Sequence, residues 1–155
     1  MRPILAKPNT RSIRWQICDP FLRFWFRYIE GNQGLIDNGM SSVLEHDIAE
    51  SYATFSRPML ERFFRQKLMR TVKYTTVGSR WKQERGAQGD LNEIDIIAVG
   101  RDRKSAFVAE VKRQKKPFLE GVFLDKVEHL KKSVLAGYEI QTACLTLDDL
   151  RSPIL

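Results

Sequence analysis

The clearest hydrophobic pattern in the chain is a pair of apolar stretches, residues 93–100 and 105–112, joined by a charged turn at 101–104. Each stretch has the length of a β-strand and, apart from charges near one end, is apolar at successive positions. The pattern therefore predicts an antiparallel hairpin in a sheet with helices on both faces.

The charges at the open end of this hairpin depend on register. If the strands pair directly across the turn, Asp95 lies opposite Glu110 and Glu93 lies opposite Lys112. All four charged side chains would then share one face, whereas a slip of one residue would put the carboxylates on opposite faces. The rest of that face would carry Ile97, Val99, Ala106 and Val108, and the other face Ile94, Ile96, Ala98, Phe107, Ala109 and Val111.

Helical and extended patterns flank the hairpin. A helix is expected to begin at Asp19 and Pro20, because aspartate caps free N–H groups and proline suits the first turn. A second helix begins near Ser42, which has capping-box spacing with Glu45, and Pro58 is expected to start a third helical segment. The other predicted elements are a short strand at 12–17, a strand within 71–81, a helix within 118–137 and a strand within 138–147.

The order of elements from Pro58 onward is helix, three strands, helix and strand. This order predicts an α/β (α+β) fold with a central mixed sheet flanked by helices. We expect residues 58–155 to form this core and residues 1–57 to form an N-terminal strand and helical extension. Residues 20–29 are apolar on nearly every side, so this helix is expected to be buried in the chain or against a neighbour.

Composition places the chain among soluble globular proteins. Its 155 residues suffice for one domain with a proper core, and no apolar run reaches the ~18 residues of a membrane span. The first residues lack a signal-peptide core, so we expect a cytoplasmic location and no membrane partner. Cys18 and Cys144 are isolated, which favours reduced structural thiols. The net charge of +7 favours attraction to polyphosphate without identifying a ligand.

The opposed carboxylates at the open end of the hairpin are the strongest chemical signal. Like charges placed directly opposite each other are destabilising unless something compensates them. The carboxylates of Asp95 and Glu110 with the Val111 carbonyl would offer hard oxygen ligands to Mg²⁺ or Mn²⁺, and Lys112 could polarise a water. The alternative is a plain salt bridge between Glu93 and Lys112, with Asp95 facing water at a strand end.

The spacing of Asp95 and Glu110-Val111-Lys112 resembles the signature of the PD-(D/E)XK, or restriction-endonuclease-like, superfamily. The predicted order of elements is similar to the core of that superfamily as well. The resemblance implies a magnesium-dependent nuclease in which an acidic residue of the preceding helix joins the site. Glu61 occupies the matching place; its alternative is a helical ion pair with Arg57 or Arg65.

A second resemblance covers most of the chain. Residues 19–28 (DPFLRFWFRY) and 93–98 (EIDIIA), together with Gly78–Trp81 and Glu110–Lys112, resemble the C-terminal domain of unknown function of archaeal-type AAA-superfamily ATPases. Leu60 stands where that family usually has Phe, and Val111 stands where it has Cys. The resemblance implies an ATPase domain as a partner or as a preceding part of a longer protein. This chain has no G-x-x-x-x-G-K-[ST] loop.

The function expected from these resemblances is a metal-dependent nuclease acting on DNA. Its catalytic residues would be Asp95, Glu110, Lys112 and Glu61. The residues expected to contact nucleic acid are Arg101, Arg103, Lys104, Arg113, Lys115 and Lys116, which we expect to flank the site. One alternative is an inactive module that binds DNA or docks on an ATPase. Another is a toxin or defence component acting on RNA, and a homodimer stays open.

Overall fold

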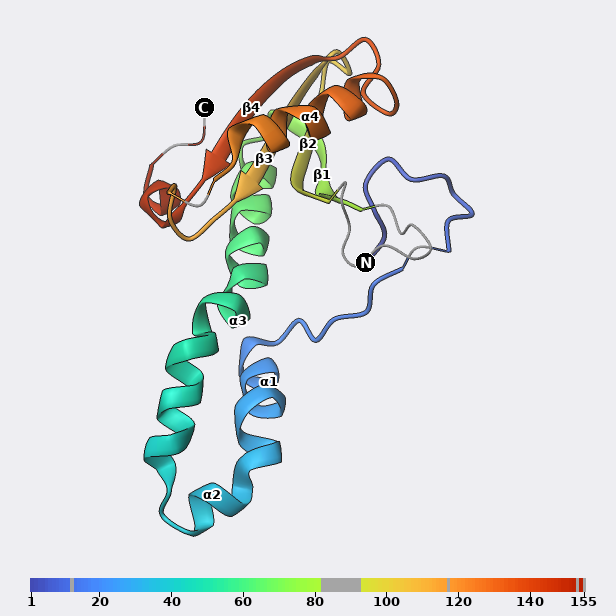
Figure 1. Ribbon diagram of the computed structural model, residues 1–155. Coiled ribbons are helices and arrows are strands. Elements are labelled where there is room, and N and C mark those ends of the chain that lie inside the picture. The colour runs from blue at the N-terminus through green and yellow to red at the C-terminus, as the bar shows by residue number, and fades with distance from the viewer. Residues whose placement is uncertain (12, 82–92, 117, 153, 155) are drawn as a thin grey trace. The chain divides into compact units, whose positions relative to one another are not determined.

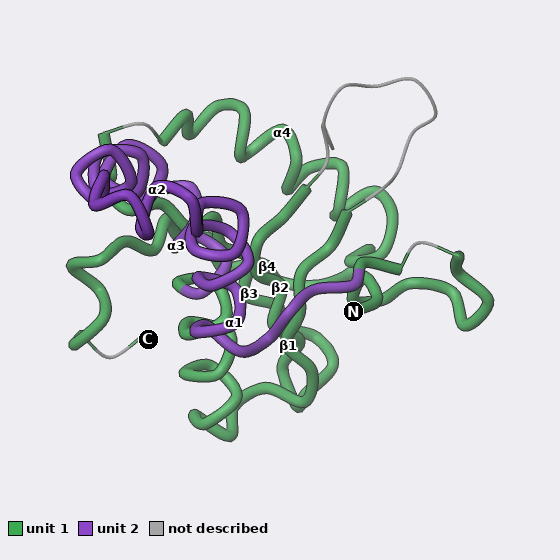
Figure 2. Tube along the Cα trace, turned by 90° about the horizontal axis from the view of Figure 1, so that it is seen from below, with its two compact units in different colours: residues 1–14, 60–155 green, residues 15–59 purple. Residues whose placement is uncertain are grey.

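The computed structural model describes residues 1–155 except 12, 82–92, 117, 153 and 155. The chain divides into two compact units (Figure 2). Unit 1 contains Met1–Arg14 and Leu60–Leu155, and unit 2 contains Trp15–Met59. The division differs from the predicted boundary after residue 57, because the first fourteen residues pack with the sheet rather than with the helical extension.

Unit 1 is built on a four-stranded sheet in the order β1-β2-β3-β4. The strands are β1 (Tyr74–Arg80), β2 (Ile94–Gly100), β3 (Ser105–Val111) and β4 (Glu139–Leu145). The first two pairings are antiparallel and the third is parallel. Helix α4 (Glu120–Lys131) makes the crossover that a parallel pair needs (Figure 1). The predicted mixed sheet with flanking helices is therefore confirmed.

The pairing of β2 with β3 follows the predicted register. Ile96 lies opposite Ala109, and Val99 lies opposite Ala106. Asp102 fixes the connecting turn, because its Oδ1 accepts hydrogen bonds from the N–H groups of Lys104 and Ser105, both at 3.0 Å. A turn held in this way leaves little freedom for the strands to slip.

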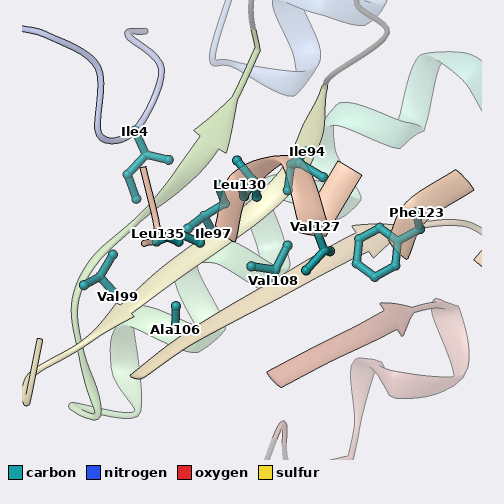
Figure 3. Close-up of a cluster of buried hydrophobic side chains, with 10 residues drawn as sticks. All are labelled: Ile4, Ile94, Ile97, Val99, Ala106, Val108, Phe123, Val127, Leu130 and Leu135. Atoms are coloured by element: carbon teal, nitrogen blue, oxygen red, sulfur yellow. The ribbon is translucent and has the colours of Figure 1, made fainter. Parts of the chain in front are cut away.

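One face of the sheet packs against α4. The buried cluster there joins strand residues to apolar residues of α4, the turn after it and the N-terminal segment (Figure 3). Its members are Ile4, Ile94, Ile97, Val99, Ala106, Val108, Phe123, Val127, Leu130 and Leu135. Ile94 is a correction, because it was predicted to share the opposite face with Ile96. The register between β1 and β2 shifts between Gly78 and Arg80, next to Ile94, and this irregularity breaks the regular alternation of faces.

The other face packs against the last part of helix α3 (Ser41–Arg70). Leu60, Phe64 and Leu68 recur every four residues and form one buried helix stripe. They belong to the second buried cluster, whose other members are Ile96, Ala98, Phe107, Ala109, Val111, Leu145 and Ile154. The chain end returns to this face through the short helix η3 (Leu147–Leu150). Helices on both sides thus keep water from the central strands.

Unit 2 is helical, as expected for the N-terminal extension. It contains α1 (Pro20–Phe24), the π-helical turn η1 (Trp25–Ile29), η2 (Glu30–Asn32), α2 (Gln33–Asp37) and the first part of α3. Asp19 caps α1, since its Oδ1 accepts from the Leu22 N–H at 2.8 Å. Tyr28 is buried and packs on the ring of Phe55. Phe21 and Phe26 stay more than half exposed within the described structure, so unit 2 does not bury the whole apolar helix.

Two predictions about this region are wrong. The described part of the short strand expected at 12–17 has no regular secondary structure; Ser12 lies outside the described residues. Pro58 does not start a new helix, because it lies inside α3, which is 30 residues long in total. A proline inside a helix removes one backbone hydrogen bond, and the long helix retains the bonds on either side. No helix in the described part of the chain has the length and apolar character needed to cross a membrane.

Candidate functional site

Asp95 lies where β2 and β3 stop pairing. The backbone ladder between the two strands runs from Val99 to Ile96, and Asp95 follows at the end of it. Its Oδ2 accepts a hydrogen bond from the Val111 N–H at 2.8 Å, so a carboxylate stands where a strand carbonyl would accept. Asp95 is only 4% exposed. A charged group this deeply buried needs compensation by hydrogen bonds or by positive charge.

The Glu110 carboxylate lies near the ammonium groups of two lysines, one directly after β3 and the other on α4. Lys112 Nζ lies 2.7 Å from Glu110 Oε1, and Lys126 Nζ on α4 lies 3.9 Å from Oε2. Residues two apart on a strand share a face, which explains why Lys112 can reach Glu110. The two lysines therefore balance the negative charge of the Glu110 carboxylate.

Cys144 is the direct partner of Glu110 on β4. Burial raises the pKa of the Cys144 thiol, and the negative charge of Glu110 raises this pKa further. The thiol is therefore protonated at neutral pH and is a poor nucleophile.

Glu61 lies on α3 and pairs with Arg65 at 3.5 Å, one turn further along the helix. The ion pair that the sequence left open as an alternative is therefore present. Arg65 Nη1 also donates to the backbone carbonyl of Asp95 at 3.1 Å. Through Arg65, Glu61 is connected to the end of β2 that carries Asp95.

Glu93 has a different partner from the one considered in the sequence. Its carboxylate pairs with Arg14, whose guanidinium stacks on the Trp81 ring at 4.5 Å. Its backbone carbonyl accepts from Lys126 Nζ at 3.2 Å. The alternative salt bridge between Glu93 and Lys112 is wrong, because Lys112 pairs with Glu110 instead.

Sequence reasoning missed Arg14 and Lys126 as neighbours of these carboxylates. Arg14 lies 79 positions before Glu93, and no pattern along the chain connects the two. Lys126 precedes the buried Val127 on α4, and its approach to Glu110 depends on how the helix packs on the sheet. Arg65 was detectable, since its spacing from Glu61 is that of a helical ion pair.

The basic residues expected to flank the site lie at two opposite ends of the hairpin. Arg113, Lys115 and Lys116 follow Lys112 directly and belong to the end that carries Glu110. Arg101, Arg103 and Lys104 form the turn at the far end of β2 and β3. Arg101 lies six positions after Asp95 along the strand, which is about 20 Å at the usual rise. These three turn residues therefore do not flank Asp95 and Glu110.

The oxygen atoms at this end of the sheet are of the kind that bind hard cations. Asp95 and Glu110 supply carboxylate oxygens and Val111 a carbonyl, and Mg²⁺ commonly takes one or two carboxylates while keeping several waters. Among the described residues, no three His, Cys, Asp or Glu side chains form a ready metal-binding group. A cation here would have to compete with Lys112 for Glu110, with water completing its coordination.

Comparisons with known proteins place the chain in a family. An uncharacterized protein of Methanocaldococcus jannaschii is 29% identical to it over 117 residues. The match covers 71% of this chain and 25% of the relative, so the chain spans about a quarter of that protein. No solved structure matches the chain. Residues 25–129, more than half of the sequence, match the DUF234 family, described as archaea bacterial proteins of unknown function, and the chain belongs to that family.

Proposed function

We propose that unit 1 is a metal-dependent nuclease-like domain that acts on phosphodiester bonds of DNA. The observation that carries the proposal is that buried Asp95 bonds to the N–H of Val111, the residue between the ion-paired Glu110 and Lys112, where β2 and β3 stop pairing. Two carboxylates and a lysine at diverging strand ends are the arrangement for which the PD-(D/E)XK superfamily is named. The basic balance of the chain, +7, supports an anionic substrate.

In this proposal Asp95, Glu110 and the Val111 carbonyl would hold Mg²⁺ or Mn²⁺. The bound cation would supply Lewis-acid polarisation of a phosphoryl oxygen and lower the pKa of a water. Lys112 would orient the attacking water once a cation draws Glu110 away from it. Lys126 would offset negative charge that develops on the phosphoryl group. Glu61 would act on the edge of the site, through its ion pair with Arg65.

The second candidate is a non-catalytic module that binds DNA or docks on an ATPase. One observation favours it: the ammonium groups of two lysines already balance the charge of Glu110 without a metal ion. The relative is about four times longer than the segment it shares with this chain, which allows the module to be one part of a larger protein. In that case the carboxylate cluster would serve as scaffold.

Nicking of supercoiled plasmid separates the two candidates. We expect cleavage with Mg²⁺ or Mn²⁺, no cleavage in EDTA, and a loss of at least ~100-fold in Asp95→Asn and Glu110→Gln. Glu128→Gln is the matched control, because it removes the same charge from an exposed position of α4 that pairs with Lys131. Cleavage that survives both site variants, or none under any metal condition, would contradict the nuclease proposal.

A further inference from the structure

Unit 1 carries a second feature that the carboxylate cluster does not explain. A pocket of about 680 Å³ lies between the last turns of α3, strand β1 and the first residues of the chain. This volume is in the range of small-molecule and nucleotide sites. The described lining residues are Met1, Arg2, Ile4, Arg62, Arg65, Gln66, Met69, Arg70, Thr76, Val77, Gly78 and Ser79.

The charge of this lining has one sign. Four of the described lining residues are arginines (Arg2, Arg62, Arg65 and Arg70), and none of them is an aspartate or glutamate. Arg62, Arg65 and Arg70 lie within three turns of α3, next to the stripe that packs on the sheet. Arg65 pairs with Glu61, and the positive charge of the lining makes the hollow electrostatically favourable for an anion.

The wall formed by the first residues and β1 is held in place by one backbone hydrogen bond and one from a side chain to the backbone. The Ile4 N–H donates to the Ser79 carbonyl at 2.8 Å, and Arg80 Nη1 donates to the Ile4 carbonyl at 2.8 Å. The segment passes so close to β1 that a Cβ added at Gly78 would lie 3.1 Å from the Ile4 Cβ. The polar residues Gln66, Thr76 and Ser79 also belong to the lining. The pocket is therefore bounded by packed structure, and its lining is positively charged.

Arg65 belongs to both the pocket and the candidate site. It lines the pocket and also donates to the Asp95 carbonyl, where the carboxylate cluster begins. We propose that the arginine-lined pocket of α3 and β1 binds the phosphates of a nucleic-acid strand and guides the strand to Asp95 and Glu110. The guidance rests on the proposed nuclease function, whereas phosphate binding does not. Arginine suits this task, since its planar fork grips phosphate oxygens in pairs.

The test is nucleic-acid binding by the full chain in EDTA, measured by fluorescence anisotropy with labelled single- and double-stranded DNA across a salt series. We expect the double variant Arg62→Ala/Arg70→Ala to bind more weakly and to lose about 1 unit of salt slope for each arginine removed. The matched control Lys132→Ala/Arg151→Ala removes two exposed positive charges outside the pocket lining. It should retain the affinity and slope of the wild type. Thermal melts confirm that each variant folds.

The outcomes distinguish the ligand and separate the two proposals. Equal loss in both double variants, or no loss in Arg62→Ala/Arg70→Ala, overturns the pocket assignment. Inorganic phosphate or a nucleoside monophosphate that displaces the oligonucleotide at equal molar concentration of phosphate groups assigns the pocket to a free anion and overturns strand binding. If the pocket variants lose binding while no metal supports cleavage, the nuclease proposal fails and strand binding stands. If cleavage occurs and the pocket variants bind normally, the nuclease proposal stands and the pocket proposal fails.

Discussion

The backbone N–H of Val111 donates to Oδ2 of Asp95 across 2.8 Å, where a regular hairpin would use a carbonyl of the facing strand. The side chain of Asp95 thereby ends the ladder between β2 and β3 and holds the two strand ends at the same time. The Asp95 carboxylate holds the two strand ends together and, under the proposed function, would also bind the metal ion. Mutations of Asp95 must therefore be chosen to separate these two roles.

Asp95→Ala should lower the free energy of unfolding by about 1–3 kcal/mol, because it leaves the buried Val111 N–H without its acceptor. Asp95→Asn should cost clearly less, since the amide oxygen can still accept that bond, although it removes the charge. Urea denaturation of both variants measures the difference. Asp125→Ala, at an exposed position of α4, is the control. Equal stability of the Ala and Asn variants would show that the hydrogen bond does not matter.

The two lysines near Glu110 should differ in their effects on cleavage. Lys112 is 2.7 Å from the carboxylate and Lys126 is 3.9 Å away, so only Lys112 makes a hydrogen-bonded pair. Under the proposed function, Lys112→Met should reduce cleavage by about 100-fold or more, and Lys126→Met by much less. Plasmid nicking gives the rates, and anisotropy in EDTA checks that DNA binding persists. A larger loss in Lys126→Met would exchange their assigned roles.

Lys67 should stabilise the chain end. Its ammonium donates to the carbonyls of Asp149, Leu150 and Ser152 at 3.0, 2.9 and 2.5 Å, which ties the end of η3 to α3. Lys67→Met keeps an apolar stem but leaves these carbonyls without a charged donor, and it should cost about 1.5–3 kcal/mol. Chemical denaturation gives the change in unfolding free energy. Lys131→Met, on the surface of α4, is the control. A similarly small effect of both variants would show that the hydrogen bonds of Lys67 to the three carbonyls do not stabilise the fold.

The hairpin was predictable because its information is local. A tight turn and two apolar strands set the register that brings Asp95 to the strand end where the Val111 N–H bonds to it, and helix spacing gave Arg65 as one of two partners considered for Glu61. Ile94 changed face because of an irregularity in its pairing with β1, which depends on a strand more than a dozen residues away in sequence. Lys126 reaches Glu110 through helix packing, which leaves no local pattern in sequence. Local patterns gave the framework of the site, and tertiary packing decided which positively charged side chains surround it.

The turn between β2 and β3 should make the fold sensitive to acid. Hydrogen bonds from the N–H groups of Lys104 and Ser105 lower the pKa of Asp102, with smaller help from the charge of Lys104. A depressed pKa means that the ionised carboxylate stabilises the fold above its ordinary unfolded pKa of about 3.9, and that this stabilisation is lost as pH falls through the folded value. The neutral variant Asp102→Asn keeps an acceptor but has no charge to titrate. The wild type should therefore exceed the variant in urea midpoint at neutral pH, and this difference should shrink as the carboxyl becomes protonated. A difference that stays constant from neutral pH to pH values below the folded pKa would show that the charge of Asp102 does not hold the turn.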